Sequence, residues 1–157
     1  MGGEIATEPA ARRSIFVSYS HKDEEWLERV RVFLAPRGAG GLGLDLWADT
    51  RIEAGSEWFA EIENALLASS HAVLLVSAAF LDSEFIWTHE IPKLIGLREQ
   101  GHRIFWIPIK PSGVRGTQLG KLQAVWSPAK PLSTLSEPEC DLALVKIAET
   151  IAGIVNR

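Results

Sequence analysis

The sequence contains a single cysteine, Cys140, among 157 residues. One cysteine forms no intrachain disulfide and no cysteine-based metal cluster, which suits a reducing compartment. Long apolar runs are also missing: none is long enough to span a bilayer, and the start MGGEIATEPAARR lacks the apolar stretch of a signal peptide. We therefore expect a cytoplasmic domain with no membrane contact.

Several chemical signatures are absent as well. The lysines and arginines are scattered and the formal net charge is -4, which gives no indication of direct nucleic-acid binding. There is no GxxxxGK[ST] phosphate loop and no GxSxG nucleophile motif. The four histidines lack metal-ligand spacing, and Cys140 has no nearby histidine. We predict neither a metal site nor a cysteine nucleophile.

Apolar segments alternate with amphipathic segments along the chain. The segments with β-type composition predict strands at 14–20, 42–47, 71–80, 103–109 and 122–126. Helices are predicted from Asp23, after Ser56, and over 83–99 and 139–155. We expect a flexible tail at 1–12 and one folded domain over 13–157.

Alternating strands and helices imply right-handed crossovers and a parallel sheet with helices on both faces. In such sheets, ligands bind outside the carboxyl ends of the strands. The loops expected at those ends contain SYSHKD, WADTRIEAG, SAAFLDSEF and KPSG. We expect the functional residues in these loops.

The segment LDSEFIWTHEIPKL (81–94) sets an acid, Glu90, among apolar residues. On an ideal helix, with about 100° per residue, Glu90 falls in the half that also carries Ile86, Trp87 and Leu94. A carboxylate there is costly unless it is paired or used. Pro92 predicts that the helix restarts near residue 91, so that the helix dipole holds Glu90 ionised. The pattern alone leaves both a structural and a functional role open.

Four motifs, in this order, resemble the TIR (Toll/interleukin-1 receptor) domain, particularly its bacterial branch. They are FVSYSHKDEEW, LWADTRIEAGSEW, LLVSAAFLDSEFIWTHEIP and LQAVWSPAKPLSTLS, and the resemblance covers about 13–155. It implies a flavodoxin-like, five-stranded parallel sheet flanked by helices on both faces. It also implies an assembly loop, similar to the BB loop of the family, formed by Asp49, Thr50, Arg51, Ile52, Glu53, Ala54 and Gly55.

Enzymatic TIR domains cleave NAD+ to nicotinamide and ADP-ribose or its cyclic isomers, and Glu90 matches their glutamate. NAD+ would then be a substrate, and no cofactor is expected. The residues that the resemblance places at the substrate are Phe16, Tyr19, Ser20, Asp49, Arg51, Trp58, Ser83, Ile86 and Trp87. Many active members carry an aromatic residue at the position of Ile86, so stacking on the substrate would fall to a neighbour such as Trp87.

The resemblance implies an NAD+ glycohydrolase or cyclase of bacterial antiphage defence, activated by self-assembly with other TIR domains and controlled by a fused or partner sensor. The alternative is a non-enzymatic scaffold that uses TIR–TIR contacts through residues 49–55. A phosphoacceptor receiver is disfavoured because the segment 71–80 has no aspartate. A nucleoside 2-deoxyribosyltransferase fits the residues of the predicted assembly loop poorly. The reaction product, the trigger and whether the chain is part of a longer protein stay open.

Overall fold

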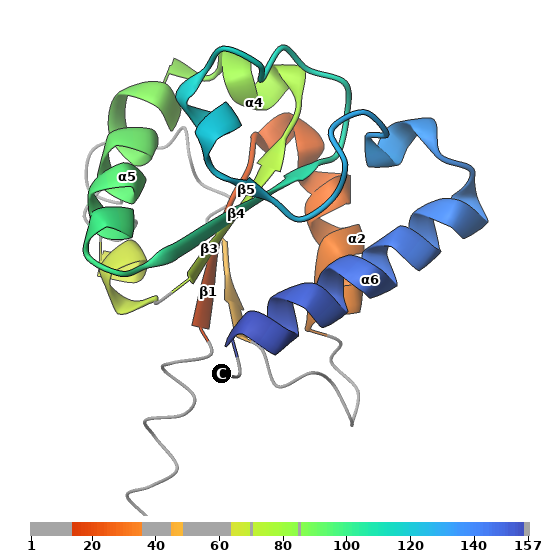
Figure 1. Cartoon of the computed structure of the whole chain (residues 1–157), viewed down its shortest axis with the longest axis horizontal. Coiled ribbons are helices and arrows are strands. Elements are labelled where there is room, and N and C mark those ends of the chain that lie inside the picture. Colours follow the sequence, from red (N-terminus) through yellow and green to blue (C-terminus); the bar gives the residue numbers. More distant parts are fainter. Residues whose placement is uncertain (1–13, 36–44, 49–63, 70, 85, 156–157) are drawn as a thin grey trace, which may run out of the picture.

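The computed structural model describes residues 14–35, 45–48, 64–69, 71–84 and 86–155 (Figure 1). Within them, the strands form one parallel sheet of five, in the order β2-β1-β3-β4-β5. The strands are β1 (Ser14–Ser18), β2 (Asp45–Trp47), β3 (His71–Val76), β4 (Arg103–Pro108) and β5 (Gln123–Ala124). This order is that of flavodoxin-like doubly wound folds. The predicted parallel α/β sheet is confirmed.

The helices lie on both faces of this sheet (Figure 1). One face is covered by α2 (Glu24–Leu34) and α6 (Glu137–Val155). The other is covered by α4 (Ala78–Asp82) and α5 (Ile91–Glu99). Because the strand order reverses between β1 and β3, the carboxyl ends of these two strands form the switch point where such folds bind ligands.

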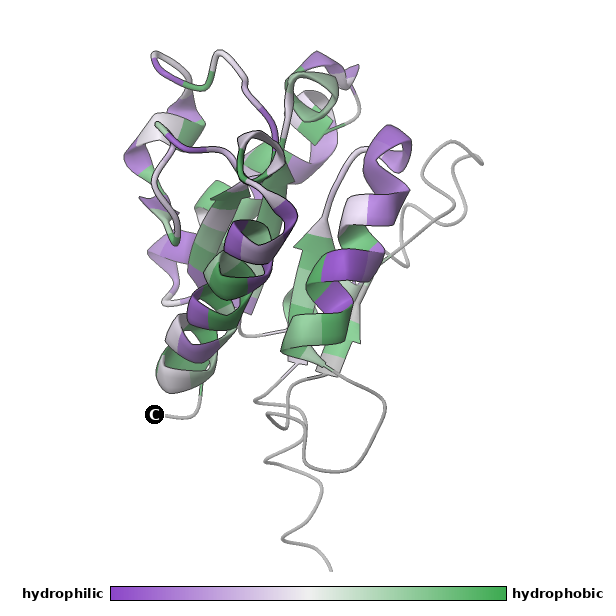
Figure 2. Cartoon of the chain, turned by 90° about the vertical axis from the view of Figure 1, so that its right-hand side faces the viewer, coloured by the Kyte–Doolittle hydropathy of each residue, from purple (hydrophilic) through white to green (hydrophobic). Residues whose placement is uncertain are grey.

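Each face of the sheet has its own apolar cluster, because successive strand residues point to opposite faces. The α2–α6 cluster contains Ile15, Val17, Tyr19, Val73, Leu75, Phe105 and Ile107 of the strand segments, Trp26, Val30 and Leu34 of α2, and Ala143, Leu144, Ile147 and Ile151 of α6. The α4–α5 cluster contains Phe16, Leu74, Val76, Ile104 and Trp106 of the strands, with Phe80, Ile86, Ile91, Leu94 and Leu97. Figure 2 shows the hydrophobic residues concentrated on the strands and on the helix sides that face them.

Strand β3 is shorter than the predicted 71–80, because the chain turns into a helix after Val76. Ser77 caps α4 by accepting a hydrogen bond from the backbone N–H of Phe80 at 3.0 Å. An apolar run alone does not distinguish a strand from a buried helical turn. The strands predicted at 14–20, 103–109 and 122–126 are also shortened, to the bounds given above. Of the predicted strand 42–47, residues 45–47 are described and are a strand.

The predicted helix over 83–99 is interrupted. A π-helical turn, η3 (Ile86–Glu90), precedes α5. Pro92 has no N–H to donate to the carbonyl of Thr88, so a continuous α-helical ladder cannot pass through this position. The restart of the helix at Ile91 confirms the break that Pro92 predicted, although the π-helical form of the turn was not anticipated.

The other helix predictions are off by one or two residues. The helix expected from Asp23 begins at Glu24, after a 3-10 turn over His21–Asp23. Helix α6 begins at Glu137 rather than at 139, because Ser136 and Glu139 form a capping box. Glu139 Oε1 accepts hydrogen bonds from the Ser136 backbone N–H at 3.2 Å and hydroxyl at 2.9 Å, and Ser136 Oγ accepts one from the Glu139 N–H at 3.3 Å.

The remaining boundary predictions fall largely outside the described residues. Of the helix expected after Ser56, residues 64–68 are described and are helical. The predicted tail, 1–12, lies outside the described residues.

Candidate functional site

Glu90 occupies the junction between η3 and α5, where it is the last residue of the π-helical turn. Its side chain is buried, with an exposed fraction of 2% for the residue. Ile86 and Ile91, on either side of it in the chain, belong to the α4–α5 cluster, whereas Thr88 and His89 are exposed. The prediction that Glu90 lies within the apolar half of this segment is therefore confirmed. Single π-helical turns within helices are frequent at functional sites.

Hydrogen bonds from the preceding loop hold the turn that carries Glu90. Ser83 Oγ accepts from the backbone N–H of Ile86 at 3.3 Å, and the Ser83 carbonyl accepts from the N–H of Trp87 at 3.2 Å. The Trp87 indole N–H donates to the carbonyl of Leu81 at 2.5 Å. Ser83 and Trp87 thus fix the path of the backbone from α4 to Glu90.

The structure divides the predicted substrate residues of the first strand segment between the two faces of the sheet. Phe16 lies in the α4–α5 cluster together with Ile86, and Trp87 packs against that cluster. Tyr19, whose exposed fraction is 0%, lies in the α2–α6 cluster on the opposite face. Ser20 is buried and accepts a hydrogen bond from the backbone N–H of Lys22 at 3.3 Å. Phe16 and Ile86 are therefore brought together, and Tyr19 is not brought to them.

Asp49, Arg51 and Trp58 lie outside the described residues, as does the whole predicted assembly loop of residues 49–55. Their proposed roles stay predictions.

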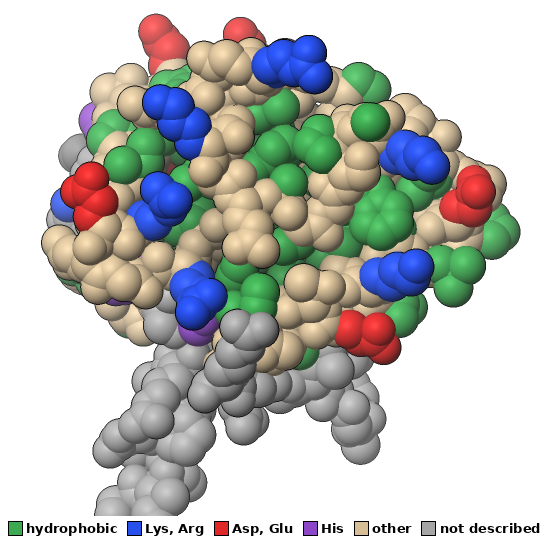
Figure 3. All heavy atoms as spheres, viewed as in Figure 1, with side chains coloured by type: hydrophobic (Ala, Val, Ile, Leu, Met, Phe, Trp, Pro, Cys, Tyr) green, Lys and Arg blue, Asp and Glu red, His purple; other side chains and the backbone are tan. Residues whose placement is uncertain are grey.

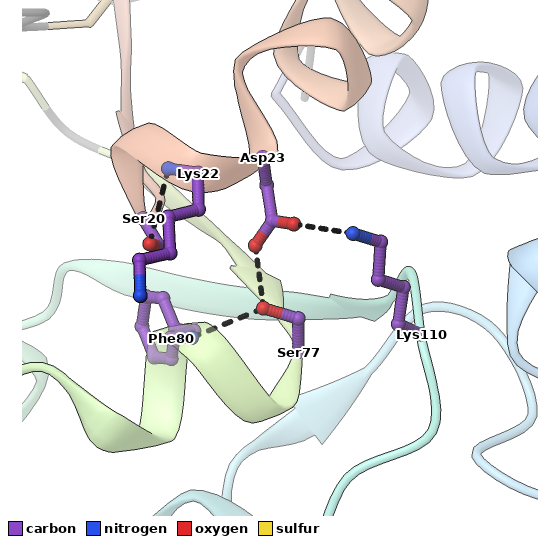
Figure 4. A network of polar contacts seen from close by, with 6 residues as sticks. All are labelled: Ser20, Lys22, Asp23, Ser77, Phe80 and Lys110. Atoms are coloured by element: carbon purple, nitrogen blue, oxygen red, sulfur yellow. Dashed lines mark hydrogen bonds and ion pairs between the residues drawn. The ribbon is translucent and has the colours of Figure 1, made fainter.

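A buried charged network that the sequence did not predict joins three loops at the carboxyl edge of the sheet (Figure 4). Asp23, after β1, is buried with an exposed fraction of 1%. Its Oδ2 accepts a hydrogen bond from the hydroxyl of Ser77, after β3, at 2.5 Å. Its Oδ1 accepts one from Nζ of Lys110, after β4, at 2.9 Å. Ser77 thereby donates to Asp23 while it also caps α4.

This network compensates the negative charge of the buried Asp23 carboxylate. The ammonium group of Lys110 compensates the charge of Asp23, and its side chain keeps an exposed fraction of 42%. Ser77 is 54 residues and Lys110 is 87 residues from Asp23 in the sequence, so no local sequence pattern predicts the network. A partial signal existed, since Asp23 and Lys110 follow the carboxyl ends of two predicted strands, which meet at one edge of the sheet. Ser77 gave no such signal, because it fell inside the strand predicted at 71–80.

In the described part of the chain, neither metal-ligating residues nor the cysteine thiol form a further reactive site. No group of three or more His, Cys, Asp or Glu residues there is arranged to hold a metal ion. Burial raises the pKa of the Cys140 thiol, which lies in the apolar core between α6 and the sheet. No helix among the described residues has both the length and the apolar character needed to cross a membrane.

A hollow of about 480 Å³ runs along the outer side of α5. The residues that line it are Leu67, Thr88, His89, Pro92, Lys93, Gly96, Leu97 and Gln100. It therefore lies mainly against the polar half of the segment predicted as a helix, and not against the half that holds Glu90.

Comparison with known proteins agrees with this fold. The chain is 30% identical over 149 residues to an uncharacterised protein, y4lF, of Sinorhizobium fredii. That alignment covers 92% of the chain but 45% of the relative, so the chain spans less than half of the relative's length. Residues 15–129 match the TIR domain family. Because this match covers most of the chain, the chain belongs to the TIR domain family.

Proposed function

We propose that this TIR domain cleaves the nicotinamide–ribose bond of NAD+, with Glu90 as the catalytic carboxylate. The observation that carries the proposal is the position of Glu90, which is 2% exposed at the end of a π-helical turn whose buried side faces the α4–α5 cluster. An acid among apolar side chains costs stability. A role in catalysis explains why an acid occupies this position.

One carboxylate is sufficient for the reaction. When the bond between ribose C1′ and the pyridinium nitrogen breaks, the electron pair leaves with the ring and nicotinamide departs as a neutral molecule. The leaving group needs no protonation, in contrast to the leaving group of common glycosides, where a second carboxyl group acts as the acid. The ionised Glu90 carboxylate accepts hydrogen bonds from ribose hydroxyls and stabilises the positive charge that develops at C1′.

The product depends on which nucleophile attacks C1′. Water attacks and loses a proton to solvent, which gives ADP-ribose. A nitrogen of the adenine ring or a hydroxyl of the same molecule gives a cyclic isomer instead. Both outcomes begin with the same bond cleavage, so Glu90 has the same role in each.

The remaining site residues would bind and orient the substrate. We assign Phe16, Ile86 and Trp87 to the apolar wall beside Glu90, because they share or pack against one cluster. Ser20 and Ser83 would supply polar groups at the same edge of the sheet. Tyr19 would support this edge from the opposite cluster without contacting the substrate. Asp49, Arg51 and Trp58 would complete the cleft.

Self-assembly would activate the enzyme. Glu90 is 2% exposed, so NAD+ reaches its carboxylate only after neighbouring segments move. Contacts between TIR domains through residues 49–55 would favour the open arrangement, and a fused or partner sensor would trigger the assembly. Destruction of NAD+, or production of a nucleotide signal, is the activity expected of an antiphage defence enzyme.

The test follows nicotinamide release from NAD+ by dilute protein, by crowded or filamentous protein, and by the Glu90→Ala variant under both conditions. We expect release by the assembled protein, much slower release by dilute protein, and none above background by the variant. Glu99→Gln, which changes an exposed acid at the other end of α5, is the matched control and should retain the activity.

An assembled wild-type protein that releases no nicotinamide would reject the enzymatic role and favour the scaffold alternative. Equal activity of wild type and Glu90→Ala would reject the role of Glu90. The assembly proposal has its own test, because Arg51→Glu and Gly55→Pro should reduce the sedimentation coefficient of the assembled protein. Unchanged sedimentation of these variants would contradict the role of the loop.

A further inference from the structure

A second hollow lies at the opposite edge of the sheet from Glu90. Its volume is about 190 Å³, and it is lined by Arg98, His102, Arg103, Ile104, Phe105 and Gln123. The lining residues come from the end of α5, from the connection that follows it, and from the first residues of β4 and β5. In Figure 1 the connection between α5 and β4 lies at the lower left. This hollow is therefore at the amino edge of the sheet, whereas η3 and the Asp23 network are at the carboxyl edge.

The wall of this hollow is cationic. Arg98 and Arg103 are exposed, and no carboxylate among the described residues forms an ion pair with either of them. His102, between them in sequence, is partly exposed. On the face seen in Figure 3, the Lys and Arg side chains are spread over the surface with uncharged atoms between them. Two guanidinium groups that have no carboxylate partner among the described residues therefore line one hollow.

The positive field reaches a neighbouring side chain. The ring of His71 stacks on that of Phe105, which lines the hollow, with ring centroids 6.4 Å apart and an angle of 11° between the planes. Burial lowers the pKa of His71, and the charges of Arg103 and His102 lower it further. An anion in the hollow would relieve this repulsion.

The position of Arg98 alone has a simpler explanation, because a cation in the last turn of a helix interacts favourably with the helix dipole. That explanation does not extend to Arg103, which begins β4, or to Gln123, which begins β5. The helix dipole therefore does not account for their place in the same hollow as Arg98.

We propose that this hollow binds the phosphate group of an inorganic phosphate or a phosphate monoester. Guanidinium groups bind phosphate oxygens through paired, charge-assisted hydrogen bonds, and the His102 ring and Gln123 amide offer further donors. The size of about 190 Å³ holds several water-sized groups, each of about 30 Å³, and therefore admits a tetrahedral oxyanion. The volume of the hollow is smaller than the roughly 300 Å³ of the smallest pockets for drug-sized ligands. Only the phosphate group of a nucleotide would therefore enter, and the nucleoside would stay outside the hollow.

The test is a titration of the full chain with inorganic phosphate at constant ionic strength, followed by two-dimensional NMR of the amides of Arg103 and Gln123 and of the His71 ring. We expect saturable shifts confined to this edge. The double variant Arg98→Gln/Arg103→Gln should weaken binding by about tenfold or more, the equivalent of 1.4 kcal/mol. The matched control Lys130→Gln/Lys146→Gln removes the same charge from exposed positions that do not adjoin the lining residues in sequence, and it should bind phosphate as the wild type does.

Adenosine monophosphate provides the second arm of the experiment. It should bind at the same place with an affinity close to that of inorganic phosphate, because only its phosphate group enters. Thermal unfolding without phosphate confirms that the variants are folded. Shifts that do not saturate, equal weakening in both double variants, or binding of the nucleotide without binding of phosphate would overturn the proposal. The outcome does not depend on NAD+ cleavage.

Discussion

Asp23 and Glu90 are both buried acids, with exposed fractions of 1% and 2%, but they stand in different surroundings. Asp23 is bonded to Ser77 and Lys110, which come from two other loops, so its burial is explained by the contacts that join the strand ends. Glu90 lies at a break between two helical segments, next to residues of the α4–α5 cluster. Burial alone therefore does not identify a functional acid.

The largest loss of stability is expected when Lys110 is replaced. Lys110→Met leaves the Asp23 carboxylate buried without its cation, and the free energy of unfolding should fall by about 3 kcal/mol. The value is at the low end for buried pairs because Lys110 is partly exposed and Ser77 still donates to Asp23. Urea unfolding measures it, with Lys121→Met, an exposed lysine, as the control.

Asp23→Asn should cost less than Lys110→Met, about 1 to 1.5 kcal/mol. The amide keeps the volume of the side chain and an oxygen that accepts a hydrogen bond, and the released ammonium group of Lys110 reaches solvent. Asp141→Asn, which alters an exposed ion pair with Arg29 at 3.4 Å, should change stability by less than about 0.5 kcal/mol. If Asp23→Asn proves the more damaging of the two network variants, the assignment of the buried charge to Asp23 is wrong.

The proposed catalytic role predicts that Glu90→Gln, which keeps the volume of the side chain and replaces a buried charge by a neutral amide, leaves the free energy of unfolding unchanged within about 0.5 kcal/mol or raises it. Chemical unfolding of the variant beside wild type provides the measurement. A loss of more than about 1 kcal/mol would make Glu90 a structural acid of the same kind as Asp23.

The smallest effect on stability is expected at Glu139, which is exposed, whereas Asp23 and Glu90 are buried. Hydrogen bonds from the Ser136 hydroxyl and then from the Ser136 N–H lower the pKa of Glu139 from its ordinary value of 4.5. The folded state therefore favours the ionised form, so the stability from this contact is full above pH 4.5 and is lost as the pH falls through the lowered pKa. The difference in thermal unfolding between wild type and Ser136→Ala should be larger at pH 7 than at pH 3, where the loss of the cap to the Glu139 N–H remains. A difference that stays constant would contradict this origin.

The alternation of apolar and amphipathic segments was sufficient to predict the parallel sheet, because each buried strand and its helix are encoded locally. The same logic placed Glu90 among apolar neighbours and predicted the break at Pro92. Element ends were less predictable, since the caps formed by Ser77 and Ser136 decide them.

The Asp23 network could not be read from a local pattern, because its members are far apart in sequence and meet only when three strand ends are aligned. Asp23 also has an adequate local explanation as a residue at the beginning of a helix. Tyr19 illustrates the other limit. Its neighbour Ser20 lies at the same strand end, but alternation along the strand turns Tyr19 to the opposite face of the sheet.

The most direct test of the central claim measures nicotinamide release and unfolding free energy on the same preparations of assembled wild type, Glu90→Gln and Glu99→Gln. The role of Glu90 in catalysis predicts that Glu90→Gln is slower by about 100-fold or more, with undiminished stability, while Glu99→Gln matches wild type in both. A Glu90→Gln protein that still releases nicotinamide at the wild-type rate, or whose loss of activity follows an equal loss of folded protein, would contradict it.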